Sequence, residues 1–177
     1  MNDLTIGAVP YSYEGSMFRF ESIEEFKTKW QDLYDEKGTE EYSLEFLDGS
    51  KIEQKIYQTL EIDSVGSVDP INLELFFEIL EEDKIKTESQ AFAFWFCVSY
   101  IGYAPSVAFE KFTDLFMFEG TPEEYAQDYI YSCVPESEIP SMIRDYIDFK
   151  KMGQDMIAEG SIVHFQKEGF CVDPYSL

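Results

Sequence analysis

Residues 69–82, DPINLELFFEILEE, predict a helix with one acidic face and one apolar face. Asp69 is a preferred N-cap residue and Pro70 suits a first turn, so the helix is expected to begin here and to run to about Glu82. Four carboxylates fall on one side of it, at positions i, i+4, i+7 and i+8: Glu74, Glu78, Glu81 and Glu82. Like charges four residues apart destabilise a helix by roughly 0.2–0.5 kcal/mol per pair, so stability does not explain this stripe.

Helix signals continue on the C-terminal side of this segment. Thr87 opens an apolar helix that is expected to end at Gly102. Thr121-Pro-Glu-Glu124 is a capping box, in which the cap residue and the third helical residue accept hydrogen bonds from each other's backbone N–H groups. The elements expected in this part are helices over 87–102, 121–132, 139–146 and 148–160, a strand around 162–166, and a segment at 107–119 that fits either a helix or a strand.

The N-terminal side combines short strands with one clear helix. Ser22-Ile-Glu-Glu25 is another capping box, and apolar residues at helical spacing follow it until Gly38. Asp48-Gly49 is a turn signal. The other expected features are short strands within 4–20, a strand over 42–46, a returning strand with partly helical character over 51–61, and a boundary at 63–68.

The order of these elements predicts the fold class. Strands, helices and strands in separate groups are typical of an α+β protein. With boundaries at 63–68 and Pro105, we expect an elongated molecule of three small lobes in a row with an acidic surface. The expected domains are an N-terminal α+β lobe at 1–66, a central helical lobe at 67–104 and a C-terminal α+β lobe at 105–177.

The charge of the chain is far outside the range that solubility requires. The 177 residues contain 36 acids and 13 bases, a formal charge of −23, whereas a magnitude of about 2–8 suffices for a small domain. The excess is spread over the chain, at net −9 for 1–66, −6 for 67–110 and −8 for 111–177. With 16 Phe and 12 Tyr the chain can still bury a core, so it is expected to fold despite self-repulsion.

The sequence offers little for catalysis. His164 is the only histidine, and its place in an apolar strand favours a structural role. The sequence has no CxxC, HExxH, EF-hand or glycine-rich phosphate-loop motif. We therefore expect no catalytic residue, no metal site and no cofactor. An enzyme that uses a pair of acids is the remaining catalytic alternative.

The cysteines and the apolar segments bear on the compartment. Cys97, Cys133 and Cys171 are odd in number and far apart, which favours free thiols in a reducing environment. The first ten residues show no basic segment of a signal peptide. The longest apolar stretch, 91–98, is too short to cross a bilayer. We expect a cytoplasmic protein that does not bind membranes.

Acidic helix faces are the candidate functional surface. A single such face is usually a solvated exterior, but here they recur in every predicted lobe with few compensating bases. One helical turn separates the carboxylates by about 5.4 Å, and duplex DNA carries a phosphate every 3.4 Å or so along each strand. By count, −23 matches roughly 12 base pairs. The candidate residues of this DNA-mimicking surface are Glu24, Glu25, Asp32, Glu74, Glu78, Glu82, Glu123, Glu124, Asp128, Asp155 and Glu159.

Two C-terminal segments carry a resemblance to a known family. Residues 109–130, FEKFTDLFMFEGTPEEYAQDYI, and 145–160, DYIDFKKMGQDMIAEG, resemble the corresponding parts of the ArdA antirestriction proteins. Gly102-Tyr103 fits as well, so the resemblance covers about 95–165. It implies an elongated, three-lobed, homodimeric mimic of bent DNA from a phage or mobile element. Such a protein would occupy the DNA groove of a type I restriction–modification enzyme in the host bacterial cell, and would bind no nucleic acid itself.

Other functions remain open at this stage. Mimicry could be directed at another DNA-binding anti-phage defence system, such as CRISPR–Cas. The chain could also be a non-catalytic acidic adaptor that dimerises through its aromatic residues and uses its charge only for solubility. A halophilic origin would also account for the charge. Binding to a DNA-binding enzyme that weakens with added salt would separate mimicry from the adaptor.

Overall fold

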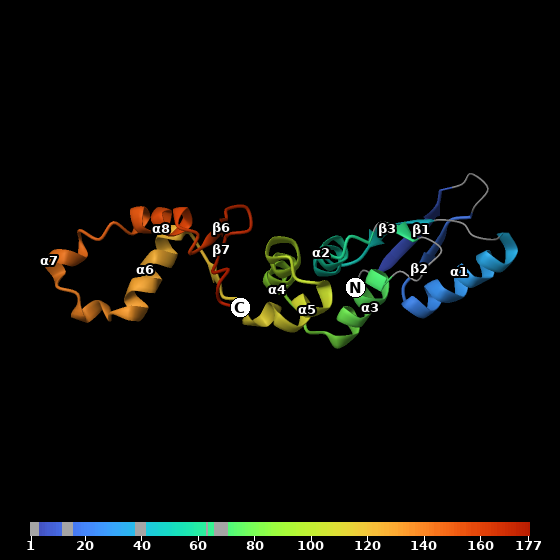
Figure 1. Cartoon of the computed structure of the whole chain (residues 1–177), viewed down its shortest axis with the longest axis horizontal. Helices are drawn as coiled ribbons and strands as arrows, with labels where there is room; N and C mark the ends of the chain where they lie inside the picture. Colours follow the sequence, from blue (N-terminus) through green and yellow to red (C-terminus); the bar gives the residue numbers. More distant parts are fainter. Residues whose placement is uncertain (1–3, 12–15, 38–41, 63, 66–70) are drawn as a thin grey trace. The chain divides into compact units, whose positions relative to one another are not determined.

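The computed structural model describes residues 4–11, 16–37, 42–62, 64–65 and 71–177. The chain forms two compact units, Met1–Phe112 and Thr113–Leu177 (Figure 1). Both combine helices with an antiparallel sheet, which confirms the predicted α+β class. The division into three lobes at 1–66, 67–104 and 105–177 stays a prediction.

The first unit is built on a four-stranded antiparallel sheet with the order β2-β1-β3-β4. The central pair joins Ala8 to Leu44, and the outer pair joins Ile6 to Phe20. The strands are β1 (Thr5–Pro10), β2 (Phe18–Phe20), β3 (Tyr42–Asp48) and β4 (Ser64–Val65). The helical elements are α1 (Ile23–Lys37), α2 (Lys51–Thr59), α3 (Ile71–Glu82), α4 (Glu88–Trp95), the π-helical η1 (Phe96–Ile101) and α5 (Pro105–Lys111).

Aromatic side chains form the core between this sheet and its helices. Phe20 of β2 lies 4.9 Å from Phe26 of α1 and 6.4 Å from Phe77 of α3, measured between ring centroids. Phe20 and Phe26 are almost fully buried, as are Ile6 and Ala8 of β1. The apolar sides of α1 and α3 are therefore fixed against the core, and their acidic sides are left to solvent.

One sequence prediction was wrong in this unit. The segment 51–61 forms the helix α2 over Lys51–Thr59, and not a returning strand. The Ser50 hydroxyl accepts from the Glu53 backbone N–H at 3.2 Å, and the Glu53 carboxylate accepts from the Ser50 N–H at 2.5 Å. Ile56, Tyr57 and Leu60 are buried at helical spacing. The turn at Asp48-Gly49 thus leads into a capped helix rather than a hairpin.

The other predicted elements of this unit are confirmed in full or in part, or lie outside the described residues. Thr87 opens α4 as predicted, through a capping box with Gln90, and the helix continues as η1 to Gly102, which has φ +85°. The predicted Ser22 capping box is formed only in part: Ser22 accepts from Glu25 N–H at 3.2 Å, but the Glu25 carboxylate accepts from the Glu21 N–H, at 2.8 Å, in place of the Ser22 N–H. The predicted stop at Gly38 and the Asp69-Pro70 cap lie outside the described residues.

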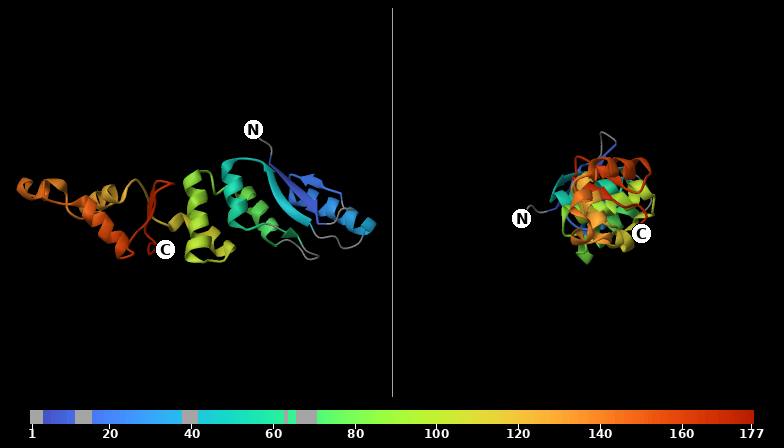
Figure 2. Two further views of the ribbon diagram at one scale, coloured as in Figure 1. Left: turned by 90° about the horizontal axis from the view of Figure 1, so that it is seen from above. Right: turned by 90° about the vertical axis from the view of Figure 1, so that its left-hand side faces the viewer.

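The second unit has a three-stranded antiparallel sheet, ordered β5-β7-β6, beside helices α6 and α8. Tyr125, Ile162 and Cys171 form its buried cluster, against which Phe118 and Met156 pack. Within this unit α7 lies at the end opposite the sheet, as both Figure 1 and Figure 2 show. The elements are β5 (Met117–Glu119), α6 (Pro122–Cys133), the 3-10 turn η3 (Glu136–Glu138), α7 (Ser141–Arg144), α8 (Phe149–Ala158), β6 (Val163–Phe165) and β7 (Phe170–Val172).

For the C-terminal part, the predicted helices and strands are present, but their residue ranges differ from the predicted ones. The segment 107–119 holds the end of α5, a 3-10 turn and β5, which explains its mixed pattern. The helix expected at 139–146 is only the four-residue α7, and the strand expected at 162–166 is β6. Asp148 caps α8 as predicted, by accepting from Lys151 N–H at 2.9 Å.

Candidate acidic interaction surface

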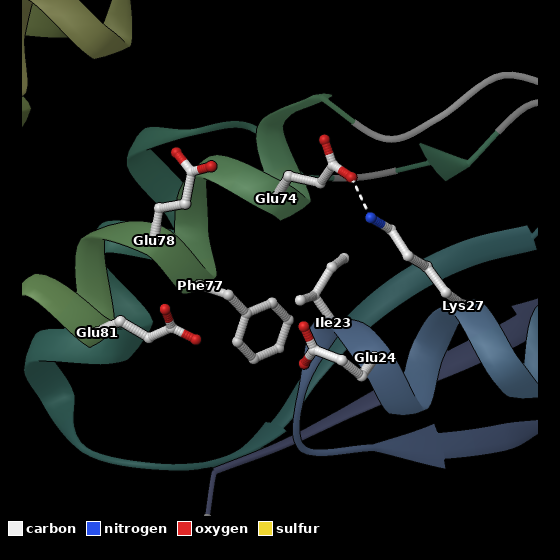
Figure 3. A pocket seen from close by; sticks show the side chains of 7 residues that line it. All are labelled: Ile23, Glu24, Lys27, Glu74, Phe77, Glu78 and Glu81. Carbon is white, nitrogen blue, oxygen red and sulfur yellow. Dashed lines mark ion pairs between the residues drawn. The ribbon is translucent and has the colours of Figure 1, made fainter.

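The most concentrated group of predicted acids surrounds a groove between α1 and α3. The groove has a volume of about 280 Å³ and is lined by Ile23, Glu24, Lys27, Glu74, Phe77, Glu78 and Glu81 (Figure 3). Phe77 is buried and points towards α1, so the two helices meet over an apolar contact. The carboxylates stand around that contact, because they occupy the solvent-facing turns of helices whose other sides are in the core.

One lysine balances part of this charge. Lys27 Nζ lies 2.5 Å from Glu74 Oε1, and both side chains are substantially exposed. Glu24, Glu78 and Glu81 form no ion pair among the described residues. The groove therefore carries a net excess of negative charge next to an apolar surface.

The groove includes a residue that the predicted site omits. Glu81 lies on the acidic stripe of the sequence, three residues after Glu78, but was not among the eleven candidates. Glu82, which was among them, is not part of the groove lining and forms an ion pair with Lys84. The i, i+4, i+7 spacing of Glu74, Glu78 and Glu81 is the sequence signal that could have identified the acids of α3 that line the groove.

Glu25 and Asp32, two other candidate acids of the first unit, differ in whether their carboxylates already bind groups within the fold. Glu25 forms an ion pair with Lys29 at 2.6 Å and accepts from the Glu21 N–H. The hydrogen bond from Lys29 is the main reason why the pKa of Glu25 is lowered. Asp32 is exposed on α1 without an ion pair among the described residues. Glu25 is thus partly committed to the N-terminal turn of its helix, while Asp32 is available to a partner.

In the second unit, Glu123 and Glu124 stand in the first turn of α6. The Glu124 carboxylate accepts from both the backbone N–H and the hydroxyl of Thr121, each at 2.8 Å. The backbone hydrogen bond is the larger cause of the lowered pKa of Glu124. Glu124 therefore remains ionised and exposed while it caps the helix, and a carboxylate at this end also suits the helix dipole.

The remaining candidates are exposed on α6 and α8. Asp128 lies on α6, Asp155 on α8, and Glu159 is the C-cap residue of α8. None of the three forms an ion pair among the described residues. The structure thus places all eleven predicted acids on helices or helix caps, and brings Glu24, Glu74 and Glu78 together at one groove.

Many of the basic side chains are engaged within the fold. Lys55 Nζ lies 4.5 Å from the ring centre of Trp95, Lys84 Nζ 4.7 Å from that of Phe109, and Lys111 Nζ 5.4 Å from that of Tyr103. Cation–π contacts hold a lysine close to an aromatic face. Ion pairs with carboxylates involve Lys27, Lys29, Lys51, Lys84, Lys86 and Arg144.

Two of the three cysteines are buried, and Cys133 is exposed at the end of α6. Burial raises the pKa of Cys97 and Cys171 to about 11, so both thiols are protonated at neutral pH. His164 is half-buried in β6, in register with Cys171 of β7. Among the described residues no group of His, Cys, Asp and Glu is arranged to hold a metal ion, and no described helix is long and apolar enough to cross a membrane.

The fold and its surface define an acidic α+β protein that presents carboxylates on its helices. The chain belongs to the ArdA family of antirestriction proteins, because the family model described as "Antirestriction protein (ArdA)" matches residues 12–172. This match extends well beyond residues 95–165, on which the resemblance in the sequence rests. No individual curated protein sequence is significantly similar to the chain. Membership assigns an antirestriction function, in a family that is not catalytic.

Proposed function

We propose that this protein inhibits type I restriction–modification enzymes by mimicking DNA, with its exposed carboxylates in place of phosphates. It would compete for the basic groove in which the enzyme holds its duplex substrate. It would bind no nucleic acid itself, because a surface of charge −23 repels phosphates. It would act in the cytoplasm of a bacterial host, where its target cleaves DNA.

The observation that supports this proposal most directly is the display of carboxylates around the α1–α3 groove. Glu74, Glu78 and Glu81 follow one side of α3, and Glu24 faces them from α1 (Figure 3). Successive helical turns repeat at about 5.4 Å, which is of the order of the phosphate spacing in DNA. Acids on two adjacent helices therefore resemble the two phosphate strands of a duplex more closely than a single acidic stripe would.

The engagement of the lysines gives the proposal further support. Lys55 and Lys111 lie over aromatic rings, and Lys27 is paired with Glu74. Positive charge held in this way contributes to folding without providing a basic patch that would bind DNA. Glu78, Asp128 and Asp155 form no ion pair within the described part of the chain, and these acids would contact lysine and arginine side chains of the target.

We also propose that the protein acts as a homodimer. Two copies would double the charge, and so the length of duplex that it imitates, to about 24 base pairs. Sedimentation equilibrium at several salt concentrations tests this point. A mass of one chain throughout would contradict the dimer, and it would leave the mimicry of a shorter duplex intact.

Competition with DNA across a salt series tests the main proposal. A purified type I restriction–modification enzyme, a labelled duplex with its recognition site and the full chain are mixed at increasing salt. We expect potent displacement of the duplex that weakens as salt rises, because charge–charge contacts are screened. Lack of displacement at low salt would reject this target. The same assay with a CRISPR–Cas complex would then test the other class of defence system.

A variant with fewer charges tests whether the carboxylates of the α1–α3 groove contribute to the competition with DNA. Replacing Glu24, Glu78 and Glu81 together by glutamine keeps their shape and removes three charges. We expect weaker displacement and a shallower salt dependence, with the fold unchanged, because these side chains are outside the core. The matched control replaces Glu110, Glu119 and Glu168, which are exposed elsewhere, by glutamine. Equal effects of the two sets would show that total charge matters and the groove does not.

A further inference from the structure

Phe116, just before β5 at the start of the second unit, is held by a segment that follows β7. The Phe116 N–H donates to the Ser176 hydroxyl at 2.8 Å, and the Phe116 carbonyl accepts from the Asp173 N–H at 3.2 Å. The Phe116 ring contacts Tyr125 but is 48% exposed, so side-chain packing fixes this residue only in part. Its backbone hydrogen bonds therefore contribute much of what holds it in place.

The Ser176 hydroxyl takes the place of one hydrogen bond of the sheet. The pairing of β5 with β7 begins at Met117 and Val172. One residue further out, the same register pairs Phe116 with Asp173, and an antiparallel pair of this kind exchanges two backbone hydrogen bonds. The Asp173 N–H makes one of them directly. The other is bridged by the Ser176 hydroxyl, which accepts from the Phe116 N–H and donates to the Asp173 carbonyl at 2.8 Å, as a bridging water would.

The local sequence explains how this hydroxyl reaches the sheet. Asp173-Pro174-Tyr175-Ser176 is typical of a β-turn, with Asp at the first position and Pro at the second. The Asp173 carboxylate accepts from the Tyr175 N–H at 2.8 Å, and the Ser176 N–H donates to the Asp173 carbonyl at 3.4 Å. These bonds turn the chain back towards the start of β5. We call residues 173–176, with their hydrogen bonds to Phe116, the entry latch.

The entry latch acts on the residue that directly follows the connection between the two units. The first unit ends at Phe112, so only residues 113–115 separate it from Phe116. When the latch is closed, the chain is fixed from Phe116 onwards. When it is open, the chain is fixed only from Met117, the first residue of β5. Each additional free residue adds backbone conformations, so an open latch gives the connection more freedom.

We propose that the entry latch limits the motion between the two units and thereby strengthens inhibition. Candidate acids lie on both units, such as Glu78 on the first and Asp128 on the second. An inhibitor whose units move less before binding loses less conformational entropy when carboxylates of both units bind one enzyme. Ser176 is thus a positioning residue, which acts through the backbone of Phe116. The effect on inhibition rests on the proposed function, whereas the closing of the latch does not.

Ser176→Ala in the full chain tests the latch, because it removes the hydroxyl and leaves every charge in place. We expect hydrogen exchange of the Phe116 amide to become about threefold to tenfold faster, the range that one hydrogen bond accounts for. NMR relaxation should show that the two units tumble more independently of each other. In competition with labelled duplex for the purified type I enzyme, affinity should fall by about threefold at every salt concentration, with the slope against salt unchanged.

Two further variants make the result specific. Ser176→Thr keeps a hydroxyl at this position and should restore all three measurements, and Ser161→Ala, at an exposed serine of the same unit, should change none of them. Circular dichroism checks that every variant folds.

Each of the other outcomes has a definite meaning. Equal protection of the Phe116 amide in Ser176→Ala and in the wild type would refute the latch. Faster exchange with no change in the motion of the units or in competition would show that the turn acts only locally, and it would refute the inference. If the wild type did not compete with duplex at all, the proposed function would fall, while amide exchange and relaxation would still decide whether the latch limits the motion of the units.

Discussion

Gly153 of α8 lies directly on the backbone of Pro122 in α6. A Cβ atom built on Gly153 would stand 2.3 Å from the Pro122 carbonyl oxygen and 2.5 Å from its carbonyl carbon. These atoms belong to the first turn of α6, next to the Thr121 capping box. The two helices that carry Glu123, Asp128 and Asp155 are thus in contact at a point where only glycine fits.

Gly153→Ala is therefore expected to destabilise the second unit. The added methyl group meets backbone rather than a flexible side chain, so one helix has to move, at a free energy of unfolding lowered by about 1–3 kcal/mol. Alanine's better helix propensity offsets only about 1 kcal/mol of this. Chemical denaturation of the full chain measures the change. Gln154→Ala, at an exposed position of the same helix, is the control and should be close to neutral. A variant of Gly153 as stable as the wild type would contradict the close packing.

The capping box of α6 predicts a defined pH dependence. The pKa of Glu124 is lowered from its ordinary value of 4.5, mainly by the Thr121 backbone hydrogen bond and then by its hydroxyl. Because the folded-state pKa is below the unfolded one, the carboxylate stabilises the fold above pH 4.5 and this contribution is lost as pH falls through the lowered value.

Glu124→Gln and Thr121→Ala test this box in different ways. Glutamine still accepts a hydrogen bond but cannot titrate, so the stability difference from wild type should change between neutral and acid pH. Thr121→Ala should raise the pKa of Glu124, as followed by carboxyl NMR, and should lower the free energy of unfolding by about 1 kcal/mol. A pKa of Glu124 unaffected by Thr121→Ala would show that the hydroxyl does not contribute.

The parts of the fold that sequence predicted well are those with local signals. The Thr121 box is formed as expected, and Thr87 begins a helix as expected, because their hydrogen bonds join residues three apart. The helix at 51–59 was missed because the turn signal at Asp48-Gly49 lies directly before the Ser50 cap and was interpreted as a hairpin. The turn signal of a hairpin and the capping signal of a helix overlap at residues 48–50. The burial of Ile56 on one side of α2 favours the helix.

Features that depend on tertiary packing could not be predicted in the same way. The acidic stripe of α3 is visible in the sequence. Glu24 lies across a groove from this stripe only because α1 and α3 meet at Phe77. The ion pair of Lys27 with Glu74 joins residues from those two helices. The contact of Gly153 with Pro122 likewise joins segments with no shared sequence pattern.

Lys27→Gln should strengthen inhibition, if the α1–α3 groove contacts basic residues of the target. The change removes the cation that neutralises Glu74, while an exposed ion pair contributes only about 0–1 kcal/mol to stability. We expect tighter competition with duplex DNA at low salt and a steeper weakening as salt rises. Lys51→Gln changes the net charge equally at an exposed pair with Glu88 outside the groove lining. An equal gain from both variants would assign the effect to net charge alone.

We expect the three cysteine thiols to differ in their reactivity towards a thiol reagent, with one reactive and two protected by burial. Cys133 is exposed at the end of α6, whereas Cys97 and Cys171 are buried. Burial raises the pKa of the latter two to about 11, so their reactive thiolates appear only as pH rises towards that value. At pH 7.5 a thiol reagent such as DTNB should therefore modify one cysteine rapidly in the native protein and all three after denaturation. Cys133→Ser should abolish the rapid phase, and rapid labelling that persisted in this variant would mean that the second unit or α4–η1 opens far more readily than its buried core predicts.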